Sequence, residues 1–107
     1  MSDMLELLCD EKGFLRDWQS WTPEIAEQFA RREKIKLTDA HWEIINLLRH
    51  YYQEFDASPA NRALVNYVKR HCDQDKGNSI YLMSLFPESP ARRASRIAGL
   101  PKPKNCL

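Results

Sequence analysis

Residues 38–55 read "TDAHWEIINLLRHYYQEF", and this stretch decides the fold. Its apolar residues recur at helical spacing, at Trp42, Ile45, Leu48, Tyr52 and Phe55. Three more, Ile44, Leu47 and Tyr51, widen that stripe. Because so broad an apolar arc must be covered from several sides, we predict one long helix from Thr38 to about Phe55 at the centre of the core. His41 and Trp42 fall in its first turn, where we predict capping and packing rather than catalysis.

Three Ser/Thr-Pro pairs punctuate the rest of the chain, at Thr22-Pro23, Ser58-Pro59 and Ser89-Pro90. Each pair suits a helix start, because the hydroxyl caps a free N–H and proline tolerates the first helical position. We predict helices after the first two pairs, a short helix over residues 79–86, and a last helix from Ser89 that closes at Gly99.

The stretch "LELLCDEKGFL" (residues 5–15) places polar residues between two apolar runs, which predicts a β-hairpin. The predicted fold class is therefore mainly α (α+β). It is a compact helical domain of about five helices with a small N-terminal β-hairpin, over residues 1–99, followed by a flexible C-terminal arm, over residues 100–107.

Composition limits the classes of protein that fit. The chain has 107 residues, of which 43% are apolar, enough for one core. We expect no membrane span and no signal peptide, and hence a cytoplasmic protein. Its three cysteines and three histidines show no metal-ligand spacing, so we expect no structural metal and no cofactor.

Charge is unevenly distributed along the chain. Residues 1–57 carry 7 Lys/Arg and 12 Asp/Glu, a balance of −5, whereas residues 58–107 carry 9 and 3, a balance of +6. The basic second half favours an acidic partner, protein or nucleic acid. Arg92, Arg93 and Arg96 cluster on the predicted last helix and leave a nucleic-acid-binding regulatory module open as an alternative, with an ordinary solvated surface beside it.

Cys106 follows Gly99, after which no helical pattern resumes. Pro101 and Pro103 favour an extended arm, and Lys102 and Lys104 favour the thiolate form. The pattern indicates a thiol that enters a partner's pocket, or else a frayed tail with an incidental cysteine.

The other two cysteines, Cys9 and Cys72, are predicted to be packing residues. The chain has no phosphate loop, nucleophile elbow or acid/base pair, which favours a carrier acting within partner complexes over a self-contained enzyme.

Four segments resemble the DsrC/TusE family of small sulfur-carrier proteins over nearly the whole chain. They are "HWEII", "EFDASPANRAL", "KGNSIYLMSLFP" and, most specifically, "IAGLPKPKNCL" with its penultimate cysteine. The resemblance implies a compact helical protein with a small hairpin and a flexible C-terminal arm. It also implies a sulfurtransferase that carries persulfide sulfur on Cys106.

The resemblance further indicates a branch of the family. Members that partner dissimilatory sulfite reductase carry a second arm cysteine eleven residues before the penultimate one, and this chain has Ser95 there. The implied role is therefore TusE-like: sulfur from a Tus B–C–D complex passes to the tRNA 2-thiouridylase with its tRNA, which thiolates the wobble uridine. A sulfite-reductase partner remains an alternative.

In that role each predicted site residue has a task. Cys106 is the carrier, and Gly99 is the hinge of the arm. Pro101 and Pro103 are expected to stiffen the arm. Lys102 and Lys104 are expected either to dock it on an acidic or RNA-bearing partner or to be ordinary solvated lysines.

Overall fold

The computed structural model describes residues 3–104 of the chain, which fold into α-helices and two short 3-10 turns. The elements in order are α1 (Asp3–Leu8), η1 (Trp18–Ser20), α2 (Pro23–Arg32), α3 (Asp39–Phe55), α4 (Asn61–His71), η2 (Gln74–Lys76), α5 (Ser79–Leu85) and α6 (Pro90–Ile97).

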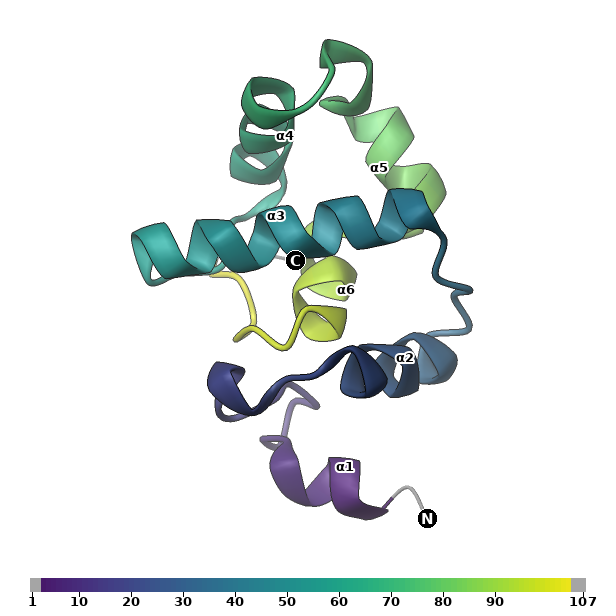
Figure 1. The fold of residues 1–107 in the computed structure, drawn as a ribbon, viewed down its shortest axis with the longest axis vertical. Coiled ribbons are helices and arrows are strands. Elements are labelled where there is room, and N and C mark those ends of the chain that lie inside the picture. Colours follow the sequence, from purple (N-terminus) through teal and green to yellow (C-terminus); the bar gives the residue numbers. More distant parts are fainter. Residues whose placement is uncertain (1–2, 105–107) are drawn as a thin grey trace.

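Helix α3 crosses the middle of the molecule (Figure 1). Helices α4 and α5 lie on one side of it, and α6 and then α2 lie on the other, with α1 beyond α2. Helix α6 contacts α2, α3, α4 and α5, so it sits at the junction of the two sides. The C-terminal arm leaves from the end of α6.

The long central helix is confirmed. Thr38 is its N-cap residue, and Asp56, with φ of 54°, ends it in the left-handed conformation. Its buried residues are His41, Ile44, Ile45 and Leu48. The last member of the predicted stripe, Phe55, is instead half exposed and packs on Tyr51 at a centroid distance of 4.6 Å.

The predicted N-terminal hairpin is wrong. Residues 3–8 form α1, and the described part of the chain contains no strand, only an isolated antiparallel bridge between Cys9 and Leu15. Leu5 of α1 is buried, and so is Cys9, which follows the helix and forms the bridge, so both join this segment to the core.

The reversal expected within residues 10–14 does occur at the bridge. The Asp10 carboxylate accepts hydrogen bonds from the amides of Lys12 and Phe14, at 2.9 and 3.0 Å. Two backbone hydrogen bonds join the two sides of this turn, from the Asp10 amide to the Phe14 carbonyl at 2.7 Å and from the Arg16 amide to the Leu8 carbonyl at 2.9 Å, which are too few for a ladder of strands.

The Ser/Thr-Pro pairs behave differently from one another. Thr22 caps α2 as predicted, with its hydroxyl accepting from the Ile25 amide at 3.2 Å. Pro90 takes the first position of α6 as predicted. The prediction for Ser58 is wrong, because α4 begins only at Asn61 and the Ser58 hydroxyl donates to the carbonyl of Pro101 at 2.6 Å.

Candidate functional site

The end of α6 sets the point from which the C-terminal arm departs. Gly99 has φ of 75°, and its amide donates to the Arg96 carbonyl at 3.1 Å. The Leu100 amide donates to the Ser95 carbonyl at 2.9 Å. This pair of bonds is a Schellman motif, in which a left-handed residue turns the chain out of a helix.

Trp21 closes over this turn. A Cβ added to Gly99 would lie 2.7 Å from Cγ and 2.8 Å from Cβ of Trp21, so only glycine fits there. The indole Nε1 of Trp21 donates to the carbonyl of Ile97 at 2.9 Å. One aromatic side chain therefore covers the turn and satisfies a carbonyl that the helix itself leaves free.

Arg49 of α3 satisfies the next carbonyl. Its Nη1 donates to the carbonyl of Ala98 at 2.7 Å, and its Nη2 donates to the carbonyl of Trp18 at 2.9 Å. Burial lowers the pKa of Arg49 from its usual value, but the guanidinium stays charged. A cation at the C-terminal end of α6 also interacts favourably with the helix dipole.

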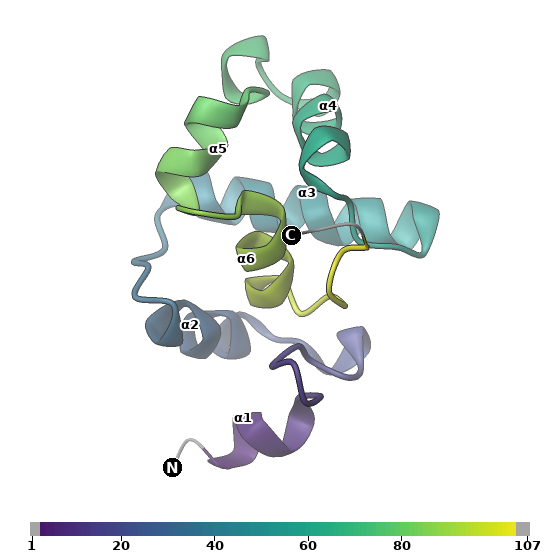
Figure 2. The same ribbon diagram turned by 180° about the vertical axis from the view of Figure 1, so that it is seen from behind.

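The described part of the predicted arm, residues 100–104, runs back from α6 toward the connection between α3 and α4 (Figures 1 and 2). Leu100 is fully buried in the core, and Pro103 is buried as well. Pro101 accepts the hydrogen bond from Ser58. Lys102 is half-buried and Lys104 exposed. Cys106, the predicted carrier, lies outside the described residues.

Of the predicted arm residues, Pro101 is thus placed at the α3–α4 connection through its bond with Ser58. Gly99 is held as a helix cap against Trp21. Its predicted hinge role and the docking roles of Lys102 and Lys104 stay predictions.

Cys9 and Cys72 are poor nucleophiles. Cys9 is buried, and desolvation raises the pKa of its thiol. Cys72 is half-buried at the end of α4, where desolvation is again the largest cause of a raised pKa, followed by the neighbouring carboxylate of Glu43. Both cysteines therefore carry less thiolate at neutral pH than an exposed cysteine would.

Position 95, which indicates the branch, lies within α6 and not in the arm. Ser95 is fully buried, and its hydroxyl has no hydrogen-bond partner among the described residues. This agrees with the last helix predicted from the sequence, which runs from Ser89 to Gly99 and contains position 95. A side chain there faces the packed core of the molecule.

The arginine cluster of α6 is largely engaged inside the molecule. Arg93 and Arg96 both pair with the carboxylate of Glu33, the C-cap residue of α2, and Arg93 also pairs with Glu88 at 2.7 Å. Arg92 is exposed. Two of the three cations offered to a nucleic-acid partner are thus bound to carboxylates of the chain itself.

His41 caps α3, as predicted. Its Nδ1 accepts from the amide of Thr38 at 3.1 Å, so Nε2 carries the ring proton and donates to the carbonyl of Leu85 at 2.8 Å. The ring also stands edge-on to Phe86 at 5.1 Å. With both nitrogens engaged, His41 is a structural residue.

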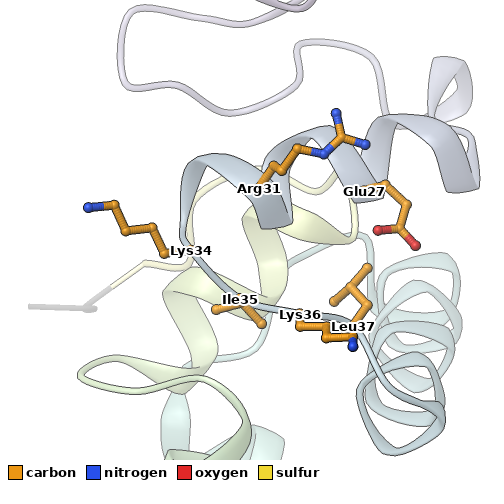
Figure 3. Close-up of a pocket in the computed structure, with 6 residues that line it drawn as sticks. All are labelled: Glu27, Arg31, Lys34, Ile35, Lys36 and Leu37. Carbon is orange, nitrogen blue, oxygen red and sulfur yellow. The ribbon is translucent and has the colours of Figure 1, made fainter.

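One pocket lies away from the arm, between α2 and the loop that follows it (Figure 3). It contains none of the predicted site residues and is lined by Glu27, Arg31, Lys34, Ile35, Lys36 and Leu37. Over residues 3–104, no group of three or more metal-ligating side chains comes together. No helix in that range is long and apolar enough to span a bilayer.

The residues that hold the arm were not predicted from the sequence. Trp18, Trp21 and Ser58 carried no chemical motif, and their contacts join segments far apart in the sequence. Arg49 had a visible signal, because it is a charged residue four positions after Ile45 and three before Tyr52, within the apolar arc.

Comparison with known proteins gives one consistent result. The family model "DsrC like protein" matches residues 2–107. A sulfurtransferase TusE homolog of Haemophilus influenzae is 48% identical over 96% of this chain and 94% of its own length. A sulfurtransferase TusE of Sodalis glossinidius is 46% identical over 95% and 94%.

A solved structure agrees with these sequence matches. The NMR structure of Allochromatium vinosum DsrC is 47% identical, with a TM-score of 0.83 over 92% of this chain and 88% of that one. The family predicted from the sequence is therefore confirmed: the chain belongs to the DsrC-like family.

Proposed function

We propose that this protein is a sulfur-relay protein that carries persulfide sulfur on Cys106 and delivers it toward 2-thiolation of the tRNA wobble uridine. The observation that carries the proposal is the match to proteins named sulfurtransferase TusE, together with a family model whose match, over residues 2–107, includes the penultimate cysteine. These names confirm sulfur transfer as the activity. They leave the sulfite-reductase alternative weaker.

The chemistry is thiol exchange. The Cys106 thiolate attacks the outer sulfur of a persulfide on the donor protein, the donor's S–S bond breaks, and the donor leaves as a thiolate. Cys106 then carries the persulfide, with no net oxidation or reduction. An acceptor thiolate attacks the outer sulfur in the same way and regenerates the Cys106 thiolate. The chain itself needs no acid/base pair, because the partner proteins bind the arm in their own pockets and supply any base there.

The proposed partners follow from the branch of the family. The donor is the Tus B–C–D complex, and the acceptor is the tRNA 2-thiouridylase with its tRNA. Ser95 supports this branch, because a chain without a thiol at that position forms no disulfide between residues 95 and 106. The regulatory nucleic-acid module is less well supported, since Arg93 and Arg96 are paired with Glu33.

Intact mass spectrometry tests the proposal. The protein is incubated with a cysteine desulfurase, cysteine and the upstream relay proteins, beside the variants Cys106→Ser and Cys72→Ser. Wild type and Cys72→Ser are expected to gain the mass of one sulfur atom, and Cys106→Ser none. A gain on Cys106→Ser equal to that of wild type would assign the cargo to another cysteine, and no gain on any chain would contradict sulfur relay.

A further inference from the structure

Arg49 reaches from the central helix to the arm root, which we define as residues 97–100. Its guanidinium carbon lies 5.0 Å from the ring centroid of Trp18 and 4.2 Å from that of Trp21. The two indoles thus hold a partly buried cation between η1 and α2, where aromatic faces stabilise positive charge. These ring contacts restrain the Arg49 guanidinium in addition to its hydrogen bonds.

The hydrogen bonds of Arg49 join three parts of the chain. One nitrogen donates to Ala98, just after α6, and another donates to Trp18 in η1, while the side chain itself belongs to α3. The planar fork of arginine suits two carbonyls at once, which a lysine ammonium does not match. Since Trp21 bonds to Ile97, the same cluster holds two consecutive carbonyls of the arm root.

We propose that Arg49 is a positioning residue for sulfur transfer, which fixes the direction in which the C-terminal arm leaves the body and hence the region that Cys106 reaches. This inference rests on the proposed function of Cys106. Among the described residues, the Arg49 side chain contacts Trp18, Trp21 and Ala98. It acts through Ala98 and the turn at Gly99.

The length of the arm explains why its direction matters. From Leu100 to Lys104, an extended proline-rich segment covers roughly 12 Å at about 3.1 Å per residue. A change of about 20° at the arm root would therefore move Lys104 by roughly 4 Å. Group transfer depends on reacting atoms being placed within about 1 Å, so a displacement of this size slows delivery inside a partner's pocket.

Beyond Gly99, the chain is held at further points that follow in order along the sequence. Leu100 is inserted into the core, Ser58 binds the carbonyl of Pro101, and Pro103 is buried. Arg49 acts before all of these, at the carbonyl that precedes Gly99. Its loss therefore changes the starting direction of the arm while leaving the thiol chemically intact.

The test uses Arg49→Gln and Arg49→Lys, with Arg62→Gln as the matched control. Arg62 is an exposed arginine on α4, remote in sequence from the arm root. The first readout is the {1H}-15N heteronuclear NOE at the amides of Leu100, Lys102 and Lys104. We expect it to fall in both Arg49 variants, to stay at the wild-type value in α3 and α6, and to be unchanged in the control.

The second readout separates positioning from thiol chemistry. Each protein is loaded with sulfur on Cys106, and its transfer to the acceptor enzyme is timed. The unloaded thiol is also reacted with a small disulfide reagent. We expect transfer by both Arg49 variants to slow about tenfold, while their reaction with the small reagent stays within about twofold of wild type.

A milder variant keeps the test decisive if Arg49→Gln does not fold. Trp21→Phe keeps an aromatic ring beside Arg49 but removes the hydrogen bond to Ile97, and it should slow transfer in the same direction. Unchanged NOE values and transfer rates in folded variants would overturn the inference, as would an equal loss in the small-reagent reaction. If wild type carries no sulfur, the proposed function itself fails, and the transfer role of Arg49 fails with it.

Discussion

Two glycines with left-handed backbones differ in what surrounds them, and this difference predicts unequal effects of the same substitution. Gly13 has φ of 87°, and an added Cβ would meet only Arg96 side-chain atoms at 3.8 Å or more. Gly99 has φ of 75° and would meet Trp21 at under 3 Å.

Gly13→Ala should cost only the backbone strain, about 1 kcal/mol. Gly99→Ala adds a clash with a packed indole and should cost about 3 kcal/mol or more in the free energy of unfolding. Urea unfolding of the two variants measures both values. Equal losses would contradict the close contact between Gly99 and Trp21.

The three cysteines should differ in their rate of alkylation. At pH 7, iodoacetamide should modify Cys106 first, because burial raises the pKa of both Cys9 and Cys72 and leaves them with little thiolate. We also expect Lys102 and Lys104 to favour the thiolate of Cys106. Peptide mass spectrometry over time gives the order, and modification of Cys9 as fast as Cys106 would contradict it.

At the scale of single residues, the sequence predicted what local spacing determines. His41 falls three residues after Thr38, and a capping interaction at that spacing is visible without a structure. The Arg49 contacts were not predictable in the same way, since they join residues 31 and 49 positions apart. Ser58 was misassigned because its contact with Pro101, across 43 positions, replaces the local cap.

Between elements, Glu33 is the main polar link of α2 to α6. Its side chain is only 10% exposed and pairs with Arg93 and Arg96, whose side chains are 23% and 19% exposed. Removing the carboxylate would leave two guanidinium groups partly buried beside each other.

We therefore predict that Glu33→Gln lowers the free energy of unfolding by about 2–3 kcal/mol, mostly through the uncompensated arginines. Glu27→Gln, an exposed position on the same helix, is the matched control and should cost less than about 0.5 kcal/mol. Urea unfolding compares the two. A similar small loss in both would mean that the α2–α6 contact is held by apolar packing alone.

The long central helix and the short helices α5 and α6 were predictable from the sequence, whereas the N-terminal stretch was not. The central helix followed from its broad stripe, and α2 followed from Thr22-Pro23 and the apolar residues behind it. The stretch "LELLCDEKGFL" is short enough to fit either a strand or a helical turn, and residues 3–8 adopt the helix, from which Leu5 is buried. The turn at residues 10–14 was right because Asp10 and Gly13 specify it locally.

At the scale of the whole molecule, the second half of the sequence is basic, but α6 does not present an open cationic face. Arg93 and Arg96 pair with Glu33, from the acidic first half of the chain. We therefore predict that the protein alone binds bare tRNA only weakly and that Arg92→Gln changes this binding less than twofold. Filter binding at two salt concentrations measures it. Tight binding with a steep salt dependence would favour the nucleic-acid module instead.

The measurement that tests the central claim most directly follows one sulfur atom through the protein. Cys106 is loaded with radiolabelled sulfur, the loaded protein is freed of its donors, and the thiouridylase, its tRNA and the activating nucleotide are added. The account predicts that label leaves the protein and appears in 2-thiouridine of the tRNA, with none transferred when the chain carries Cys106→Ser. Label that stays on wild-type protein, while the tRNA is thiolated from another source, would contradict the account.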